Sequence, residues 1–296
     1  MDDLVLIGVP VDSVGRSGGT ELGPGALREL GLAEAVRAED RGDLDLSIRG
    51  EERDPETGIV AAADVLAATE EIRAAVAALV GEGRRPLLAG GCCSELPGAL
   101  AGARDAVGPV GLAHVDGHAD LYDGRTSTTG EAADMPISVV LGLGPRRWVE
   151  AAGGPGAEAE RTLLIGYRDR KESIADGMRQ PEQLEPAPGL HPIERVRSDG
   201  ARETGELAAA ILAGTGPFWL HLDVDVLDQA AFPATDYLMS GGMSWEELDQ
   251  LLPPLLSAER LIGASIACYN PEKDPDCACG RALIHSLRPL GPRLAG

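Results

Sequence analysis

The sequence predicts an α/β fold with three layers, α/β/α, in which helices cover both faces of a mainly parallel sheet. Two observations predict it. Short apolar runs alternate with longer segments of helical spacing, and polar residues follow several of the runs. Ligands bind at the carboxyl ends of the strands in such folds. With 296 residues, 44% of them hydrophobic, the chain can bury one large core, and we expect a single domain spanning residues 1–296.

The strands and helices are predicted from the spacing of apolar residues. Runs that are apolar on both faces predict buried strands at 4–10, 85–91, 110–116, 162–169, 217–225 and 260–270. Segments rich in Ala, Leu and Glu with helical spacing predict helices at 58–83, 202–214, 245–257 and 278–288. Two segments rich in Gly, Pro, Glu or Ala, 150–160 and 178–192, are predicted to be surface loops.

Composition excludes several classes of function. The chain carries 26 basic and 48 acidic residues, for a formal charge of −22, which disfavours contact with nucleic acid or anionic lipid. The first residues lack the basic start of a signal peptide, and no window approaches a transmembrane span. Five cysteines, two of them adjacent, do not resemble a secreted disulfide framework. We therefore expect a cytoplasmic protein that binds a small molecule.

The segment HVDGHAD at 114–120 places charged groups where a buried strand runs out. Asp116, His118 and Asp120 occupy alternate positions, which predicts that they share one face of an extended segment. Two carboxylates and an imidazole on one face repel each other and resist burial unless a cation lies among them. A metal ion is the expected cation.

A second acidic cluster, HLDVDVLD at 221–228, follows another apolar run. Asp223 and Asp225 are again two residues apart, with Leu222 and Val224 facing the other way. Hard oxygen ligands with a single nitrogen favour Mn²⁺, Mg²⁺ or a similar ion, and the two clusters hold enough carboxylates to bridge two ions. An isolated pair of this kind is more often a cap or a turn, but two clusters after buried runs favour metal binding.

Two further histidines, His114 and His221, precede the clusters by two residues and are expected on the same side. In one interpretation each histidine has a role in the site, as a proton donor or through a hydrogen bond to a ligand carboxylate. In the other it is a structural histidine without such a role.

Taken together, these motifs resemble those of the ureohydrolases, the family of arginase, agmatinase and formimidoylglutamase. LVLIGVPVDSVGRSGGTELGPGALREL is similar to the family's first strand, glycine loop and helix start, and DGHAD to its DAHxD. HLDVDVLD is similar to SxDxDxxDP, and ACYNPEKDPD to ExNPxxD. The resemblance covers nearly the whole chain. It implies an arginase-like fold, a trimer or hexamer, and two manganese ions that serve hydrolysis of amidine or guanidine C–N bonds.

The resemblance also implies a ligand set. It makes Asp116 and Asp223 bridge the ions, His118 and Asp225 complete one site, and Asp120 serve the other. The remaining family ligand is the histidine of GGDHS, and the corresponding stretch here, GGCCS, has Cys93 in its place. A thiolate is a competent ligand, softer than imidazole and anionic. The alternative is that Cys93 is only a small buried residue after a glycine turn.

A Cys93 thiolate would change the charge of the centre. With the four aspartates it brings five negative charges to two divalent ions, one more than a histidine would. The extra charge weakens the Lewis acid and raises the pKa of the water that the ions activate. We infer a substrate that is easier to attack than a plain guanidinium, or one with a better leaving group. The branch that hydrolyses N-hydroxyarginine resembles this chain in that cysteine and in the segment FPATDYLMSGGM at 232–243.

Two departures from the family affect the reaction itself. In TSTTGEAADMP, residues 126–136, the family's proton-transfer histidine corresponds to Ala133, so Asp120, His221 or water would supply the proton. Cys268 stands where the family has a glutamate that grips the guanidinium. Its loss removes a charged hydrogen bond worth about 1.5–3 kcal/mol. Cys268 either packs against Cys93, attacks the substrate covalently, or is a small strand residue.

Other departures affect substrate recognition. Lys171 replaces a carboxylate that holds the α-amino group in arginases, and would attract a carboxylate or phosphate instead. Tyr122 replaces an asparagine that contacts the α-carboxylate. Arg168 and Asp169 either line the pocket mouth or form a surface ion pair. The residues expected to contact substrate are Tyr122, Thr129, Asp169, Lys171 and Cys268.

The sequence therefore predicts a metal-dependent hydrolase of an amidino, N-hydroxyguanidino or related C–N bond, with Asp120 and His221 as catalytic residues. Two alternatives stay open. One is a family member that has lost catalysis and serves as a binding or oligomeric scaffold. The other is a hydrolase with one ion, held by Asp116, His118, Asp223 and Asp225.

Overall fold

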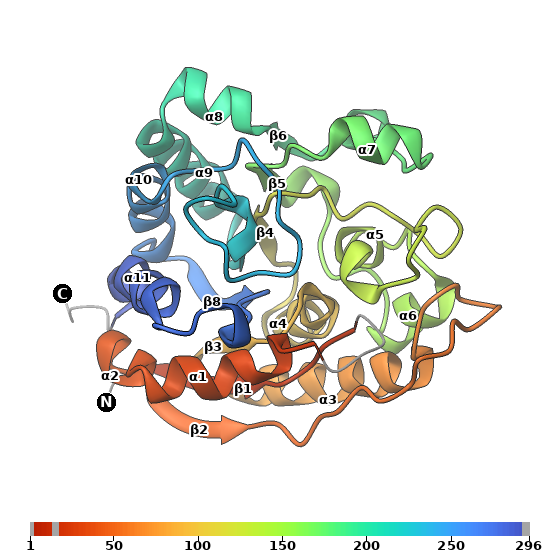
Figure 1. The fold of residues 1–296 in the computed structure, drawn as a ribbon, viewed down its shortest axis with the longest axis horizontal. Helices are drawn as coiled ribbons and strands as arrows, with labels where there is room; N and C mark the ends of the chain where they lie inside the picture. The colour runs from red at the N-terminus through yellow and green to blue at the C-terminus, as the bar shows by residue number, and fades with distance from the viewer. Residues whose placement is uncertain (1–2, 14–17, 292–296) are drawn as a thin grey trace.

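One eight-stranded sheet runs through the protein, with the strand order β2-β1-β3-β8-β7-β4-β5-β6 (Figure 1). The computed structural model describes residues 3–13 and 18–291, so part of the glycine loop, residues 14–17, lies outside the described residues. All neighbouring strands are parallel. The strands are β1 (Leu4–Val9), β2 (Glu39–Asp43), β3 (Arg85–Gly90), β4 (Gly111–Val115), β5 (Thr162–Ile165), β6 (Gly189–His191), β7 (Phe218–Asp223) and β8 (Leu261–Ala267).

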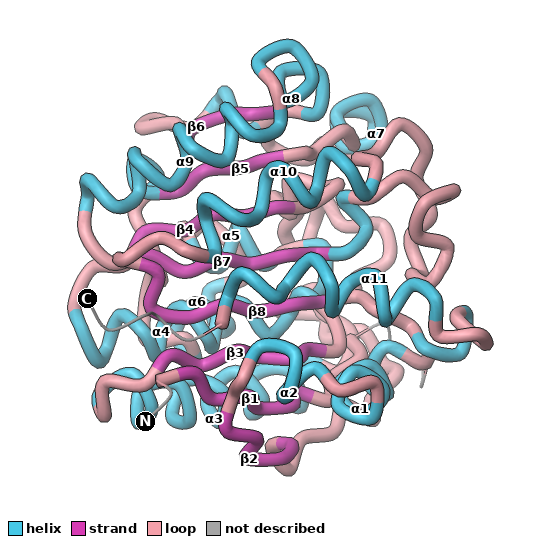
Figure 2. Tube along the Cα trace, turned by 90° about the vertical axis from the view of Figure 1, so that its left-hand side faces the viewer, coloured by secondary structure: helices cyan, strands magenta, loops and turns pink. Residues whose placement is uncertain are grey.

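Helices cover both faces of the sheet, as Figure 2 shows. One layer contains α3 (Ala62–Gly81), α4 (Leu96–Val107), α5 (Pro136–Val140) and α6 (Arg146–Ala151). The other contains α1 (Gly23–Glu29), α2 (Leu32–Val36), α8 (Ile193–Asp199), α9 (Ala201–Thr215), α10 (Trp245–Leu256) and α11 (Ala278–Leu287). A short helix, α7 (Arg170–Ala175), follows the carboxyl end of β5. The predicted three-layer α/β/α class is confirmed.

The six predicted strands and four predicted helices are present, with ends shifted by a few residues. Two strands were not predicted. β2 has the sequence EDRGD and is mostly exposed at the sheet edge, so it carries no apolar pattern. β6 lies within 178–192, so the prediction that this whole segment is a surface loop was wrong. It joins the sheet through three residues beside β5, too few to leave a periodic signal.

Helix α4 was also missed, because its glycines interrupt the helical pattern. The same glycines let it pack closely on α3. A Cβ atom at Gly98 would lie 2.7 Å from the Thr69 carbonyl oxygen, and one at Gly102 would lie 2.4 Å from that of Arg73. The close approach of α4 to α3 fixes the position of the residues just before α4, which include Cys93.

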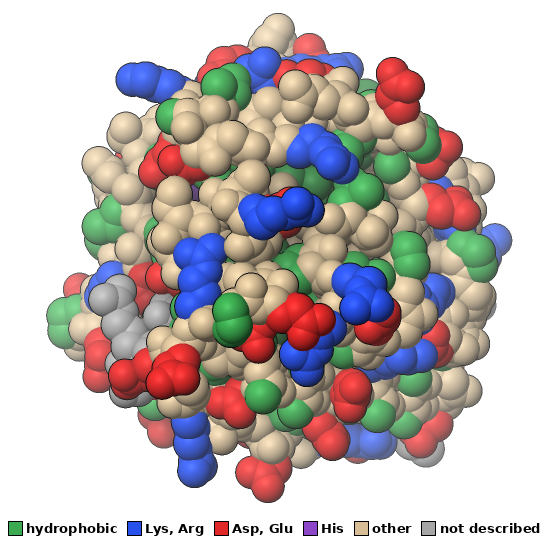
Figure 3. All heavy atoms as spheres, turned by 90° about the vertical axis from the view of Figure 1, so that its right-hand side faces the viewer, with side chains coloured by type: hydrophobic (Ala, Val, Ile, Leu, Met, Phe, Trp, Pro, Cys, Tyr) green, Lys and Arg blue, Asp and Glu red, His purple; other side chains and the backbone are tan. Residues whose placement is uncertain are grey.

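The surface mixes charges of both signs. On the face in Figure 3, basic and acidic side chains are interspersed, with hydrophobic side chains between them. Among residues 3–13 and 18–291, none of the helices has both the length and the apolar character needed to cross a membrane.

Candidate metal centre

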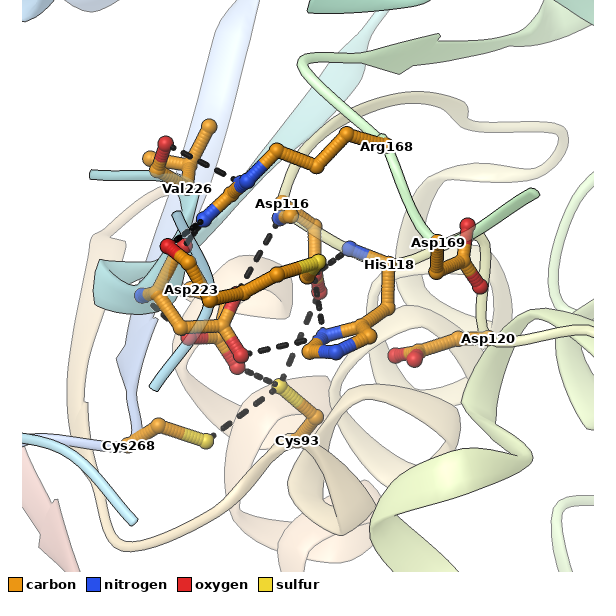
Figure 4. Close-up of polar contacts among 12 residues, drawn as sticks. Cys93, Asp116, His118, Asp120, Arg168, Asp169, Asp223, Val226 and Cys268 are labelled. Carbon is orange, nitrogen blue, oxygen red and sulfur yellow. Dashed lines mark hydrogen bonds and ion pairs between the residues drawn. The ribbon is translucent and has the colours of Figure 1, made fainter. Parts of the chain in front are cut away.

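Four adjacent strands, β3, β8, β7 and β4, end at the same edge of the sheet, where they bring the predicted ligands together with Cys268. Cys93 follows β3 and Cys268 follows β8. Asp223 ends β7, and Asp116 directly follows β4. Their side chains meet in the close-up of Figure 4, and the sulfur atoms of the two cysteines point toward each other.

Asp223 is the last residue of β7, whereas Asp116, Asp120 and Asp225 lie beyond the strand ends, which corrects the prediction that these aspartates alternate along extended segments. β4 ends before Asp116, and Asp120 adopts a left-handed conformation with φ +51°. Residues 224–226 form a single 3₁₀ turn. In these turns the backbone can reach the carboxylates: His118 N–H donates to Asp116 at 2.6 Å, and Asp225 N–H donates to Asp223 at 2.7 Å. Backbone donors thus orient the carboxylates.

One group of ligand atoms consists of Asp116, His118 and Asp225, which lie within 4.8 Å of one another. His118 Nδ1 is 3.0 Å from Asp225 Oδ2 and 3.6 Å from Asp116 Oδ1. Gly117 N–H donates to Asp225 Oδ1 at 3.1 Å. These two carboxylates and one imidazole could hold one divalent ion.

A second group surrounds Cys93, whose side chain is buried. Its Sγ lies 2.7 Å from Asp223 Oδ2, 4.0 Å from Asp116 Oδ2 and 3.8 Å from Cys268 Sγ. Cys93 therefore lies within reach of the carboxylates predicted to bridge two ions. Asp120 gathers with Asp116 and His114 rather than with this sulfur group.

Two buried histidines lie behind the ligands. His221 Nε2 is 3.2 Å from Cys93 Sγ, and its Nδ1 is 2.7 Å from Ser265 Oγ. Ser265 also accepts a hydrogen bond from Trp219 Nε1 at 3.0 Å. The His114 ring stacks on that of His221 at 5.4 Å, and its Nε2 is 3.2 Å from Asp116 Oδ2. Both histidines contact ligands rather than solvent.

Burial controls the protonation of the centre. It raises the pKa of Asp116 to about 7, aided by the charges of Asp120 and Asp225. It also raises the pKa of Asp223, Asp120 and the Cys93 thiol well above their ordinary values. Despite burial, the carboxylates of Asp225 and Asp116 hold the pKa of His118 well above its ordinary value. Several ligand atoms therefore hold protons that a cation would displace.

We expect the contribution of Asp116 to the unfolding free energy of the metal-free protein to fall as pH rises from about 4 to about 7. The unfolded pKa of an aspartate is about 3.9, and the folded pKa of Asp116 is about 7. Between these values the folded state keeps a proton that the unfolded chain has released, so rising pH favours unfolding. Urea denaturation across this range should show Asp116→Asn gaining stability relative to wild type as pH rises. A constant difference would contradict this account.

No lysine or arginine side chain among residues 3–13 and 18–291 forms an ion pair with the carboxylates of Asp116, Asp120, Asp223 or Asp225. Asp120 Oδ2 is buried without a hydrogen-bond partner, as are both ring nitrogens of His114. Buried acidic groups in this state lack the charge that would stabilise their ionised form. The donor set therefore fits divalent cations.

A comparison with known proteins decides the family. The model of the Arginase family matches residues 2–287.

The chain belongs to the arginase family.

Relatives extend over the whole chain. It is 28% identical over 288 residues to an arginase of Brevibacillus brevis, with 95% of each chain covered. The solved structure of Bacillus caldovelox arginase has 26% identity and a TM-score of 0.87, and 100% of both chains is covered. A formimidoylglutamase structure from Bacillus subtilis, at 19% identity and a TM-score of 0.74, covers 98% of this chain and 86% of that one, and shows the shared fold alone. Arginase-family membership indicates a hydrolase.

Two pockets with shared lining residues lie at the centre of this arginase-family protein. A cavity of about 40 Å³ is lined by Cys93, His118, Asp120, Tyr122, Ala133, Asp134, Asp223, Asp225, Tyr237 and Cys268. It shares His118, Tyr122, Asp134 and Tyr237 with an outer pocket of about 280 Å³. Five acidic side chains line that outer pocket: Asp134, Asp169, Glu172, Asp176 and Asp236.

The residues predicted to contact substrate are distributed unevenly. Cys268 lines the inner cavity, Thr129 and Asp169 line the outer pocket, and Tyr122 lines both. Lys171 is exposed on α7 and lines neither pocket. His221 also lies outside the lining, behind Cys93. Their roles stay predictions, but the outer pocket is acidic, whereas Lys171 was expected to attract a carboxylate or phosphate.

Three residues of the site were not singled out in the sequence. Tyr237 lines both pockets and packs edge-on against His118. Asp134 accepts hydrogen bonds from Ser127 and Thr129. Glu95 is fully buried without a hydrogen-bond partner, and burial together with Asp223 raises its pKa. Tyr237 lies in the segment that resembles the N-hydroxyarginine branch, whereas Glu95 left no signal.

Arg168 has a different role from the two that were predicted for it. It lines neither pocket, and its contacts are with backbone carbonyls rather than with Asp169. Its guanidinium instead donates to the backbone carbonyls of Asp225, Val226, Leu227, Met239 and Ser240. A Cβ atom at Gly117 would lie 2.5 Å from Arg168 Nη1, so the glycine in DGHAD leaves room for this side chain.

Proposed function

We propose that this protein is a metal-dependent hydrolase of a small molecule with an amidino, N-hydroxyguanidino or related C–N group, and that it is not a plain arginase. The observation that carries the proposal is the convergence of buried Asp116, Asp223 and Asp225 with His118 and Cys93 at one sheet edge. Among the described side chains no lysine or arginine forms an ion pair with these carboxylates, and their basic neighbours are histidines.

The ligand set that the family resemblance implies supports two ions. Asp116, His118, Asp223 and Asp225 would hold one, and Cys93, Asp116, Asp120 and Asp223 the other. Bound divalent ions, Mn²⁺ by the donor set, supply a water that is nucleophilic at neutral pH and polarise the substrate. Asp120 lines the inner cavity and has a raised pKa, so it can receive a proton and pass it to the departing nitrogen.

His221 is suited to an indirect role. Burial lowers its pKa well below the ordinary value, so the ring is neutral. Its contact with Cys93 at 3.2 Å orients the sulfur and does not reach the cavity.

The inner cavity argues for a substrate other than free arginine. Cys268 lines it where family members use a glutamate, and Ala133 lines it where they use a histidine. A guanidinium entering this cavity would therefore lack the charged partner and the proton donor. An N-hydroxyguanidine carries an electron-withdrawing hydroxyl oxygen, so it depends less on a charged partner and on a proton donor from the protein.

Metal analysis followed by a substrate panel tests the proposal. We expect two ions per chain after purification with Mn²⁺, and turnover of at least one compound among arginine, N-hydroxyarginine, agmatine, guanidino acids and formimino compounds. A single ion per chain together with turnover would support the alternative of a hydrolase with one ion. Chains that bind no ion and turn over none of these compounds would support a scaffold.

The Cys93→His variant is expected to raise turnover of plain guanidines about tenfold, a barrier change of about 1.4 kcal/mol. The substitution removes one negative charge from the ligands, which strengthens the Lewis acid and lowers the pKa of the activated water. Steady-state kinetics on arginine and agmatine measure the effect. Cys92→Ala is the matched control, because its sulfur contacts Ser13 and Ser94 rather than the centre. Equal rates in wild type and Cys93→His would contradict the charge argument.

A further inference from the structure

A pair of buried cysteines distinguishes this centre from one made only of carboxylates and imidazoles. Cys93 and Cys268 are 175 residues apart in sequence, yet their sulfur atoms are 3.8 Å apart. Both line the inner cavity, so ions and small molecules that enter it reach them. Asp223 completes a compact group with the two sulfurs, with its ligand atom within 4.8 Å of each.

The spacing of the two sulfurs matches a known coordination geometry. Thiolates bind Zn²⁺ at about 2.3 Å, and two of them in a tetrahedral shell are about 3.8 Å apart. Cys93 and Cys268 have this separation without any rearrangement. The Cys93 thiol also donates to Asp223 Oδ2 at 2.7 Å, and this hydrogen bond would open, with loss of the thiol proton, for the sulfur and the oxygen to share one ion.

The backbone of Cys268 supports a functional role for its side chain. It has φ +69°, a left-handed conformation that is strained for a residue with a Cβ. The conformation is held by a hydrogen bond of 2.7 Å from Cys268 N–H to the carbonyl of Gly91, in the turn that carries Cys93. Strain of this kind persists where surrounding structure enforces a functional geometry. Here it turns Cys268 toward Cys93 (Figure 4).

We propose that Cys93, Cys268 and Asp223 bind a thiophilic divalent ion such as Zn²⁺. The harder set of Asp116, His118 and Asp225 keeps its preference for Mn²⁺, so the centre holds two different metals. Thiolates select Zn²⁺, whereas carboxylates suit Mn²⁺. As each sulfur–metal bond forms, the thiol proton leaves to solvent. The inference rests on the proposed metal-dependent function and names the ion in one half of the centre.

Cobalt binding tests the sulfur contacts directly. The chelator-treated full chain, kept reduced and free of oxygen, is titrated with Co²⁺, which replaces Zn²⁺ and gives a near-ultraviolet charge-transfer band when thiolates bind it. Cys277→Ser/Cys279→Ser serves as the background, because these cysteines are only half-buried. We expect the band with the first equivalent of Co²⁺, at about half intensity in either Cys268→Ser or Cys93→Ser, and unchanged in Cys92→Ser. Equal bands in wild type and Cys268→Ser would overturn the proposal.

Metal competition provides a second measurement. After dialysis against equal concentrations of Zn²⁺ and Mn²⁺, elemental analysis of wild type is expected to give one of each per chain. Cys93→His/Cys268→Glu replaces both sulfurs with harder ligands and should lower zinc retention at least tenfold. Circular dichroism checks that the variants fold. If they do not fold, the presence or absence of the wild-type cobalt band decides whether the sulfurs bind the ion.

The outcomes separate this inference from the proposed function. A wild type that binds two Mn²⁺ and excludes Zn²⁺ overturns the sulfur site and leaves the hydrolase proposal standing. A wild type that binds neither metal overturns both. A Cys93–Cys268 disulfide that persists in the metal-free protein after reduction also overturns the sulfur site.

Discussion

Replacing Asp223 by asparagine is expected to abolish hydrolysis and lower metal affinity by more than about 100-fold, the largest loss usual for groups that only orient a ligand. Asp223 lies between the two groups of ligand atoms: Oδ1 accepts a hydrogen bond from Asp225 N–H, and Oδ2 contacts Cys93. An amide keeps this shape but loses the charge that both ions need. Isothermal titration with Mn²⁺ and elemental analysis measure the loss.

The same variant should make the metal-free protein more stable. Asp223 is buried beside Asp225 and Asp116, and burial and these charges raise its pKa. Asparagine carries no charge, so it removes the repulsion from Asp225 and Asp116, and the unfolding free energy should rise. Glu259→Gln, at an exposed carboxylate just before the amino end of β8, is the control and should change neither property. If Asp223→Asn bound Mn²⁺ with wild-type affinity, Asp223 would not be a metal ligand.

Arg168→Met is expected to destabilise the protein by about 3 kcal/mol, within the range for losing charged hydrogen bonds to buried groups. The methionine fills part of the same space but donates to none of the carbonyls of Asp225, Val226 and Leu227. Because Asp225 lies on the released segment, Mn²⁺ affinity should fall as well. Urea denaturation and metal titration measure the two effects.

The neighbouring Arg170 offers a matched control. Its side chain is exposed and forms a surface ion pair with Glu182. Such pairs contribute about 0–1 kcal/mol, so Arg170→Met should leave both stability and metal affinity nearly unchanged. Similar losses in the two variants would mean that Arg168 acts only as surface charge, and that the segment from Asp225 to Ser240 is held by other contacts.

The sequence predicted the central strands because buried parallel strands leave unbroken apolar runs. The edge strands β2 and β6 left no such run, since one is exposed and acidic and the other is three residues long. Helix α4 was missed for a different reason. Gly98 and Gly102, which weaken a helix, are needed there for close packing on α3, and a pattern of local propensity does not record that packing.

In the candidate site, the residue types were predictable and their distances were not. Asp116 and Asp223 follow apolar runs, so a shared sheet edge could be expected. The meeting of Cys93 with Cys268 depends on β3 and β8 lying side by side, which no spacing in the sequence reveals. The role of Arg168 was not predicted because its partners are backbone carbonyls. Every residue has one, so the partner segment carries no sequence signal.

The two pockets differ sevenfold in size, with about 40 Å³ inside and about 280 Å³ outside. The inner space admits only a few heavy atoms, so a molecule would present one tip to the centre while its bulk stays outside. A bond in the middle of a chain, or one flanked by rings, would not reach the ions. On the proposed function, we therefore expect a substrate that presents an end group to the centre and carries positive charge along the length that stays in the acidic outer pocket.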